Sequence, residues 1–433
     1  MLPIIKTSIP GPKSREALKE LRQVENPHIT YGDKDFPIFI EKSFDSLVED
    51  VDGNTLIDTT SFFAVSFFGH QHPRLKNAMS KSLDRGWHAM GDVYPHRLKL
   101  QAAKDLCDFL PKGLGQVHFS CNGSDAVETA LKTAYLKTQK RGVIAFEGAY
   151  HGLGYGAMQV THRNYFRQPF SKQARLPVSF HPFITNESAD IVVNKALQKI
   201  NRDLETKEIG ALIIETIQGR GGIRVAHPKF IQGLRKLCTR HGVALIIDEI
   251  YTGFFRAGLA FDYLNYKITP DLLCLGKAMG GGYPISACVG RKEWMKVWGE
   301  SFGEAKHTST FLGNPLGCAL VIESLRLFQT KSVQRRAQSL SKHLEKSLFA
   351  LKTEFPEYIH SVKGRGLMWG LEFRDRGIGS AICKTMLKQG VIILACGQFA
   401  EVLSFSPAIS LNKKQLDYVL LALRRCLQAA KTP

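Results

Sequence analysis

Short runs of apolar residues alternate with longer amphipathic stretches along the middle of the chain. The runs have the length of buried strands and end in or near glycine or an acidic residue. They are Gln116–Ser120, Val143–Phe146, Ala211–Glu215, Ala244–Asp248 and Leu272–Leu275. A loop and then a helical pattern are expected after each run. This alternation predicts an α/β fold with a mostly parallel sheet flanked by helices.

Helical spacing of apolar residues is clearest directly after the first predicted strand. The positions that repeat there are Ala126, Val127, Ala130, Leu131, Ala134 and Tyr135. Amphipathic helices are also predicted at Ser14–Glu25, Ser332–Leu351 and Lys413–Ala430. We expect residues 61–330 to form a large domain that holds the sheet. We expect the N-terminal segment, residues 1–60, and the C-terminal segment, residues 331–433, to form a smaller α+β domain.

Composition places the chain among soluble globular proteins. Of its 433 residues, 44% are hydrophobic and 22% are charged, which excludes disordered, collagen-like and disulfide-scaffold classes. No apolar run approaches the ~18 residues that a membrane helix needs. The nine cysteines are odd in number, scattered, and contain no C-x-x-C pair. They read as reduced thiols, which predicts a cytoplasmic protein.

The net charge is unusual. Lys and Arg number 58 against 39 Asp and Glu, which gives +19. Such a charge indicates either that the partners are nucleic acid or anionic substrates, or that the protein simply has a basic, solvated surface. The charges are interleaved along the whole chain, without a Lys/Arg block or zinc-finger spacing. We therefore expect a basic surface and no nucleic-acid partner, and we predict no metal site.

Two charged residues stand where predicted strands end. Asp248 closes one strand, and Lys277 follows another. In parallel sheets, ligands bind outside the carboxyl ends of the strands. An Asp and a Lys at such an edge form a structural ion pair or serve a ligand. Gly276 and Gly280–Gly282 let a ligand approach the backbone around Lys277 closely, which an ion pair does not require.

Two loops predicted at the same edge add further chemistry. A strand turns through Gly123 and opens a helix near Ser124, where free N–H groups form an anion site or an ordinary capped helix start. Tyr150 and His151 follow another strand on a glycine-rich loop, and the tyrosine ring can cover a planar ligand or simply pack. Together an amine, a carboxylate, an aromatic lid and an anion cradle meet the needs of pyridoxal 5′-phosphate.

Six motifs then appear in a fixed order along the chain. They are Val51–Asp58, Gly69–Pro73, Glu215–Gly219, Asp248–Phe254, Leu275–Pro284 and Thr310–Pro315. With them the sequence resembles the class III aminotransferases, the 4-aminobutyrate and ornithine branch of the fold-type I pyridoxal-phosphate enzymes. The resemblance runs from about residue 36 to residue 430.

The resemblance implies roles for single residues. Lys277 matches the Schiff-base lysine, and Asp248 matches the partner of the pyridine nitrogen, so these two are the expected catalytic residues. Tyr150 matches the aromatic residue that stacks on the cofactor ring, and Ile250 matches the residue on its opposite face. Gln218 matches the contact to the ring's phenolic oxygen.

Further cofactor contacts are implied around the phosphate. Gly123 and Ser124 match the phosphate-binding turn. Thr310 matches a residue that a second subunit donates to the phosphate, which implies a homodimer with shared active sites. His151 adjoins Tyr150, and Glu215 opens the motif that contains Gln218, so both are counted with the cofactor-binding residues.

Substrate handling departs from the family pattern at three positions. Glutamate-using members carry Arg, Glu and Arg where this chain has Leu153, Arg220 and Ser404. Arg220 therefore binds a substrate carboxylate from another wall, or the site accepts amines with an apolar far end. In the second case Phe63, one of a cluster of four phenylalanines, narrows the pocket.

The resemblance implies that an amino group moves from an amine or 4-aminobutyrate-like ω-amino acid to a 2-oxo acid. An aminomutase or a racemase on the same scaffold is the alternative, and it needs no 2-oxo acid. A non-catalytic, nucleic-acid-binding role conflicts with the presence of both Lys277 and Asp248.

Overall fold

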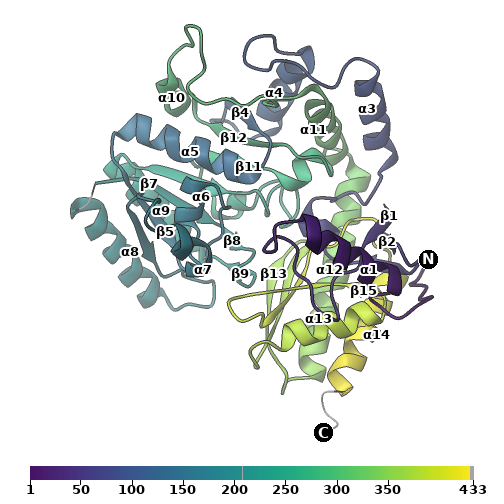
Figure 1. Ribbon diagram of the computed structural model, residues 1–433. Helices are drawn as coiled ribbons and strands as arrows, with labels where there is room; N and C mark the ends of the chain where they lie inside the picture. Colours follow the sequence, from purple (N-terminus) through teal and green to yellow (C-terminus); the bar gives the residue numbers. More distant parts are fainter. Residues whose placement is uncertain (207, 430–433) are drawn as a thin grey trace. The chain divides into compact units, whose positions relative to one another are not determined.

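The computed structural model describes residues 1–206 and 208–429, and it divides the chain into two compact units (Figure 1). One unit combines residues 1–73 with residues 335–433, and the other is residues 74–334. The boundaries thus fall at Pro73 and Gln334, whereas the sequence led us to expect them after residues 60 and 330. We call the two parts the terminal unit and the central unit.

The central unit is built on a seven-stranded sheet that is parallel except for one strand. The strand order is β4-β12-β11-β10-β7-β5-β6, and only β12 runs antiparallel to its neighbours. The five predicted strands are confirmed: β4 (Gln116–Ser120), β5 (Gly142–Phe146), β7 (Ile209–Glu215), β10 (Ala244–Asp248) and β11 (Leu272–Leu275). The other two strands were not predicted: β6 (Val178–His181) and β12 (Ser286–Gly290).

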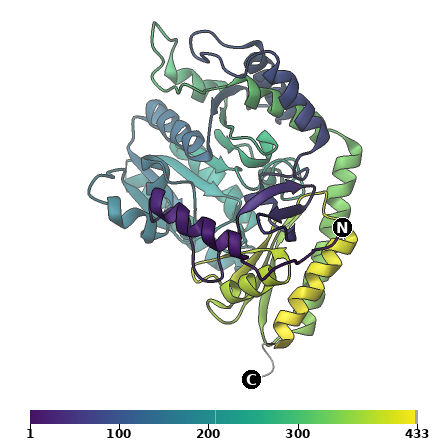
Figure 2. The ribbon, with the colours of Figure 1, turned by 45° about the vertical axis from the view of Figure 1, so that its right-hand side comes forward.

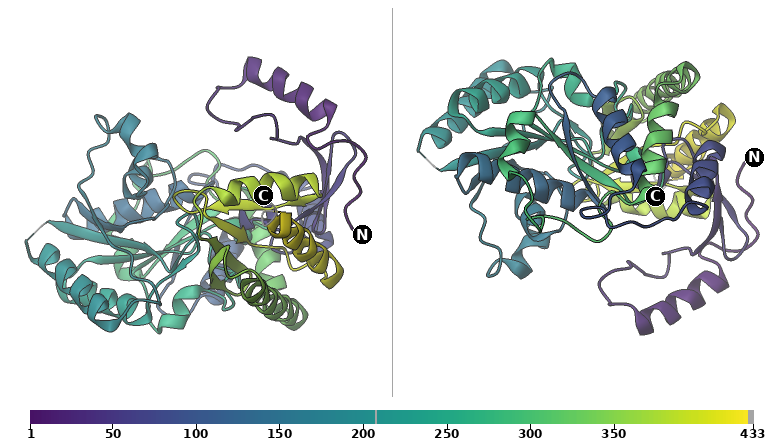
Figure 3. Two further views of the ribbon diagram at one scale, coloured as in Figure 1. Left: turned by 90° about the horizontal axis from the view of Figure 1, so that it is seen from below. Right: turned by 90° about the horizontal axis from the view of Figure 1, so that it is seen from above.

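The central strands are apolar on both faces because helices cover both faces (Figure 3). Helix α5 (Gly123–Thr138) packs on one face, where its alanines meet alternate strand residues such as Ile213 and Ile246. On the other face, Phe230 of α9 (Pro228–His241) contacts Phe146 at a ring-centroid distance of 5.6 Å. Helix α8 (Asp190–Thr206) packs against α9. This sandwich fixes the strand ends at one common edge.

The predicted helices after β10 and β11 are wrong. The first connection contains only the 3₁₀-helix η2 (Asp262–Tyr266), and the second contains only the 3₁₀-helix η3 (Lys277–Gly280). Phe254 and Phe255 have φ angles of 56° and 63°. Residues in this left-handed region cannot continue a right-handed helix. The chain after β10 therefore forms turns that stay close to the sheet edge.

The central unit also contains shorter elements around this frame. They are α3 (Pro73–Leu83), α4 (Arg97–Phe109), α6 (Tyr155–Val160), α7 (Asn164–Arg167), η1 (Gln168–Phe170), β8 (Ile217–Gln218), β9 (Arg224–Val225), α10 (Lys292–Met295), η4 (Lys296–Trp298) and α11 (Pro315–Phe328). In the described part of the chain, no helix is long and apolar enough to cross a membrane.

The terminal unit joins both ends of the chain in an α+β body with two four-stranded sheets. Its helices are α1 (Pro12–Val24), α2 (Ser61–Ala64), α12 (Lys331–Glu354), α13 (Ile378–Lys388) and α14 (Lys413–Ala429). Figure 2 shows α12 and α14 side by side. His343 of α12 contacts Asp417 of α14, and Arg424 of α14 contacts Glu354 of α12. The predicted last helix is thus confirmed to residue 429, and residue 430 lies outside the described residues.

The two sheets of this unit mix early and late segments of the chain. The first has the order β1 (Ile40–Phe44), β2 (Leu47–Asp50), β3 (Thr55–Asp58), β15 (Val391–Ile392). The second has the order β13 (Ile359–Arg365), β14 (Met368–Phe373), β17 (Val402–Phe405), β16 (Leu394–Cys396). Because β15 pairs in parallel with β3, the N-terminal and C-terminal segments share one core.

A left-handed turn follows β3. Its residues, Ser61 to Ala64, have φ angles of 43°, 47°, 60° and 66°. Each such residue costs about 1–2 kcal/mol. Asp58 offsets part of this cost, since its carboxylate accepts from the N–H groups of Thr60 and Phe62 and from His70 Nε2. Phe63 projects from this turn with 64% of its surface exposed.

Candidate active site

The carboxyl ends of three neighbouring strands bring the predicted chemistry together. Asp248 at the end of β10 stands in register with Glu215 at the end of β7 and with Cys274 of β11. Lys277 follows β11 after one further residue, Gly276. Two carboxylates and one amine therefore share the edge at which parallel sheets bind ligands.

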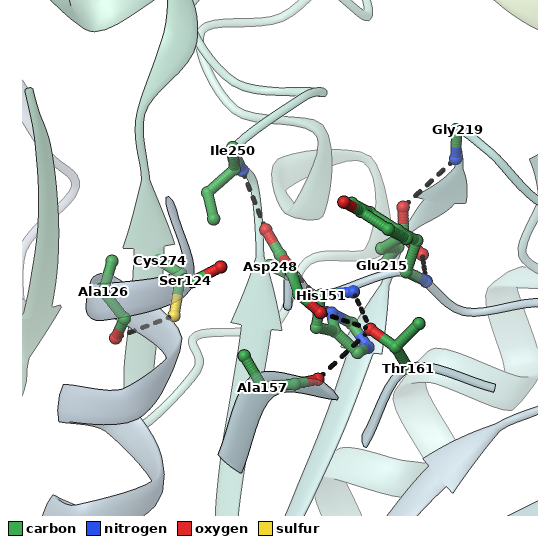
Figure 4. Close-up of polar contacts among 12 residues, drawn as sticks. Ser124, Ala126, His151, Ala157, Thr161, Glu215, Gly219, Asp248, Ile250 and Cys274 are labelled. Carbon is green, nitrogen blue, oxygen red and sulfur yellow. Dashed lines mark hydrogen bonds and ion pairs between the residues drawn. The ribbon is translucent and has the colours of Figure 1, made fainter. Parts of the chain in front are cut away.

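Asp248 is held from two sides. Its Oδ1 accepts a hydrogen bond from the Ile250 N–H at 3.0 Å, and its Oδ2 lies 2.8 Å from His151 Nδ1 (Figure 4). An ionised carboxylate only accepts, so His151 donates through Nδ1. The Asp248 and His151 side chains are 5% and 0% exposed. This pair fixes both the position of the carboxylate and the tautomer of the imidazole.

The backbone of His151 is anchored by a second contact. The His151 N–H donates to Thr161 Oγ1 at 2.9 Å, at the end of α6. Its Nε2 atom is buried and has no hydrogen-bond partner among the described residues. Thr161 was not singled out in the sequence, because nothing in the residues around it marks a contact to the loop before α6.

Glu215 ties two loops of the site to the sheet. Its Oε2 accepts from the Tyr150 N–H at 3.0 Å and its Oε1 accepts from the Gly219 N–H at 3.1 Å. Burial raises the pKa of Glu215 to about 7, and nearby Asp248 contributes to that rise. Glu215 therefore holds the loop that carries Tyr150 and the loop that leads to Arg220.

Lys277 combines a distorted backbone with a shielded amine. Its φ angle is 44°, and its Nζ lies 4.4 Å from the centroid of the Tyr251 ring. Burial lowers the pKa of the Lys277 amine, with Asp248 and Glu215 acting in the opposite direction. A lowered pKa leaves more of the amine unprotonated, and the unprotonated amine is the nucleophile toward carbonyl carbons.

Arg220 stacks on the aromatic residue of the site. Its guanidinium carbon lies 4.7 Å from the ring centroid of Tyr150 and 5.7 Å from that of Phe166. Arg220 is exposed, yet its charge lowers the pKa of Lys277. The guanidinium is thus braced by two rings at the edge that carries the amine.

The helix start that was predicted as an anion site lies beside these residues. Helix α5 begins at Gly123 after Asn122, whose side chain accepts from the Asp125 N–H at 3.1 Å. A Cβ at Gly123 would lie 2.9 Å from Ile250 Cδ1, so a larger residue there would displace the Ile250 side chain. Ser124 Oγ accepts from the Leu153 N–H at 3.0 Å. The first turn of α5 thus abuts both the Asp248 turn and the Tyr150 loop.

The remaining predicted site residues are Gln218, Thr310 and Phe63. Gln218 is buried and its amide is engaged, since Nε2 donates to the Glu147 carbonyl and Oε1 accepts from Arg224. Thr310 is exposed, in a surface segment of the central unit. Phe63 belongs to the terminal unit. The structure brings together the other eight cofactor-binding candidates: Lys277, Asp248, Tyr150, His151, Glu215, Ile250, Gly123 and Ser124.

Tyr251 is the contact that sequence reasoning missed. It lies inside the Asp248–Phe254 motif, so the signal was present, but no role was attached to it. Its proximity to Lys277 depends on the turn after β10, which replaces the predicted helix.

An amine of lowered pKa beside two buried carboxylates suits reactions with a carbonyl compound. Comparison with known proteins identifies the family. The sequence profile of the class-III aminotransferases matches residues 29–427. The chain therefore belongs to the class-III aminotransferase family, whose members use pyridoxal phosphate.

Similar proteins agree with this assignment. The acetylornithine aminotransferase of Methanosarcina mazei is 30% identical over 391 residues, covering 90% of this chain and 91% of that protein. The acetylornithine aminotransferase of Methanopyrus kandleri is 33% identical over 340 residues, covering 78% and 82%. A transaminase from the marine bacterium Virgibacillus has the same fold, with a TM-score of 0.86 at 21% identity over 96% of this chain and 100% of that one.

Proposed function

We propose that the group around Asp248 and Lys277 is the pyridoxal-phosphate site. The main observation in its favour is that the buried Asp248 carboxylate, oriented by His151, lies at the same sheet edge as Lys277, whose pKa is lowered. Lys277 would bind the aldehyde carbon of the cofactor, and Asp248 its ring nitrogen. Tyr150 and Ile250 would cover its two faces. The first turn of α5, with Gly123 and Ser124, would receive its phosphate, because helix N-termini bind anions.

The bound cofactor supplies a ring that accepts the electron pair left on a substrate carbon when its proton departs. The protein's part is to place protons and charges. Asp248, held by His151 and the Ile250 N–H, keeps a negative charge where the ring nitrogen needs a proton. Once the substrate amine has displaced Lys277 from the cofactor, its free Nζ would take the proton from the substrate carbon and return it to a neighbouring carbon. Glu215 holds the two loops that carry Tyr150 and Arg220 in place at this edge.

We further propose that the amino donor is an ω-amino acid of the 4-aminobutyrate type, that the acceptor is a 2-oxo acid, and that Arg220 binds their carboxylates. A guanidinium suits this task because it binds a carboxylate through two parallel hydrogen bonds. Its stacking on Tyr150 and Phe166 restrains it beside Lys277 without neutralising it. The relatives' named substrate, acetylornithine, likewise has its free amine remote from its carboxylate.

Replacing Arg220 by alanine should raise KM for carboxylate substrates about 10- to 100-fold, because a hydrogen bond to a charged group contributes about 1.5–3 kcal/mol. The KM of an amine that has no carboxylate, such as butylamine, should not change. The measurement is steady-state kinetics with 4-aminobutyrate, acetylornithine and butylamine as donors, each with and without a 2-oxo acid.

A matched control exists in the terminal unit. Arg376 also stacks on an aromatic ring, with its guanidinium carbon 4.1 Å from the centroid of Phe399. Arg376→Ala should leave all three KM values unchanged. Equal KM values for carboxylate donors in the Arg220 variant and the parent would contradict the proposal. Turnover without a 2-oxo acid would favour the aminomutase or racemase alternative.

We also propose a homodimer. The segments 87–100 and 302–311 form one surface, since the rings of His88 and Phe311 lie 5.2 Å apart. Thr310 is exposed on this surface. Large apolar side chains are exposed there too: Trp87 (63%), Tyr94 (72%), Phe302 (91%) and Phe311 (58%). Such a patch is typical of an interface.

Sedimentation should therefore give about twice the chain mass of 48.3 kDa. A monomer at working concentration would contradict the dimer and the expected role of Thr310 in a partner's phosphate site.

All nine cysteines are free, which supports the proposal that the enzyme works in the reducing cytoplasm.

A further inference from the structure

The turn after β10 places an aromatic ring directly against the reactive amine. Tyr251 follows Ile250, the residue whose N–H donates to Asp248. Its half-buried ring carries the Lys277 amine on its face, with Nζ 4.4 Å from the ring centroid. The face of an aromatic ring is electron-rich and attracts an ammonium group within about 6 Å of the centroid.

The charged groups around Lys277 act in opposite directions. Asp248 and Glu215, at the ends of β10 and β7, favour the protonated amine. Arg220 and Arg256, from the loops after β8 and β10, disfavour it, as does burial. Each of the two carboxylates also holds hydrogen bonds of its own. The Tyr251 ring adds an attraction to the protonated form without adding a charge to the site.

We propose that Tyr251 is a positioning residue for Lys277, whose ring face holds the amine and favours its protonated form. The ring limits the directions that the flexible lysine side chain can take, and it restores part of the proton affinity that burial removes. This inference rests on the proposed role of Lys277. It is tested on the amine of the cofactor-free protein, so its failure would leave the cofactor site and the proposed substrates untouched.

Substitutions of Tyr251 can distinguish an effect of the aromatic ring from an effect of side-chain volume. Phenylalanine keeps the aromatic face and lacks only the hydroxyl. Leucine fills much of the space with an apolar group that has no such face, and glutamine is a polar replacement of similar length. A purely space-filling role would therefore group leucine with phenylalanine, whereas our proposal groups leucine with glutamine.

The experiment is a titration of Lys277 in the full-length, cofactor-free protein. The probe is 1-fluoro-2,4-dinitrobenzene, which has no ionisable group and reacts only with unprotonated amines. Its rate of reaction at Lys277 is followed from pH 6 to 11 by mass spectrometry of the peptide that contains this residue. The inflection of rate against pH gives the pKa of the amine.

In Tyr251→Leu and Tyr251→Gln the inflection should move down by about one pH unit, because removing an attraction to the ammonium lowers the pKa. Below the inflection, Lys277 in these variants should therefore react about tenfold faster than in the parent. In Tyr251→Phe the inflection should stay within about 0.3 unit of the parent value. Either non-aromatic variant that keeps the parent's circular dichroism spectrum decides the question.

Phe255→Leu is the matched control. Phe255 is a half-buried aromatic residue of the same loop, and its ring stacks on Phe328 at 5.9 Å. This variant should titrate like the parent. The proposal is overturned if a non-aromatic variant that keeps the parent's circular dichroism spectrum titrates like the parent. It is also overturned if Tyr251→Phe shifts as far as Tyr251→Leu, which would assign the effect to the hydroxyl.

Discussion

Replacing Lys277 by alanine is expected to abolish covalent binding of pyridoxal phosphate and to lower turnover by roughly 10⁴- to 10⁶-fold. The proposed covalent bond to the cofactor and the proposed proton transfer from the substrate carbon both depend on Lys277 Nζ. The measurements are the visible absorption band of the purified enzyme, borohydride trapping followed by peptide mapping, and kcat with the best donor.

Lys363→Ala serves as the control for this variant. Lys363 is also shielded, with 18% of its side chain exposed, and it pairs with Glu372 at 2.7 Å on a strand of the terminal unit. Its loss should leave the absorption band and kcat in place. The assignment of Lys277 as the reactive amine would be wrong if Lys277→Ala retained turnover and bound the cofactor covalently at another lysine.

The second large effect is expected from Asp248→Asn. The change removes a negative charge and little volume, so the fold should persist. An amide NH₂ beside His151 Nδ1 would place two donors face to face, which forces the imidazole into its other tautomer. We expect kcat to fall roughly 10²- to 10⁴-fold, the equivalent of losing about 3–5 kcal/mol from a buried charge pair. Covalent capture of the cofactor by Lys277 should survive.

Asp271→Asn is the control that distinguishes a loss of catalysis from a loss of stability. Asp271 is also a buried carboxylate, but it lies at the amino end of β11, where it pairs with Arg235 at 2.7 Å and accepts from the Leu245 N–H. Its replacement should lower the melting temperature and leave kcat unchanged. If Asp248→Asn behaved in the same way, Asp248 would be a structural residue, and the ring-nitrogen role would have to be given up.

The sequence predicted those strands that need burial on both faces. An apolar run such as Ala244–Asp248 has few alternatives to the centre of a sheet, so five strands could be located. Strand β12, Ser286–Gly290, was missed because its residues are small and show no apolar run. Its antiparallel direction follows from a tight return of the chain, which no periodicity encodes.

The candidate site could also be predicted only in part. Asp248 and Lys277 could be found because each stands where a strand ends. The bond between Asp248 and His151 could not, because it depends on β5 and β10 lying on either side of β7. The contact between Tyr251 and Lys277 likewise depends on β10 and β11 being neighbours in the sheet. Local residue type thus indicates which groups react, and strand order decides which groups meet.

The antiparallel strand β12 has a consequence for the order in which the site can assemble. Residues 276–285 leave β11 and re-enter the sheet on β12, where Leu275 pairs with Ala287. Such a short hairpin closes at little entropic cost and forms early in folding, whereas crossovers between parallel strands form late. Lys277 is therefore placed by contacts near in sequence, and the carboxylates around it arrive from distant segments. In a partly folded chain the amine would keep its ordinary proton affinity, so its reactivity reports that the whole sheet has formed.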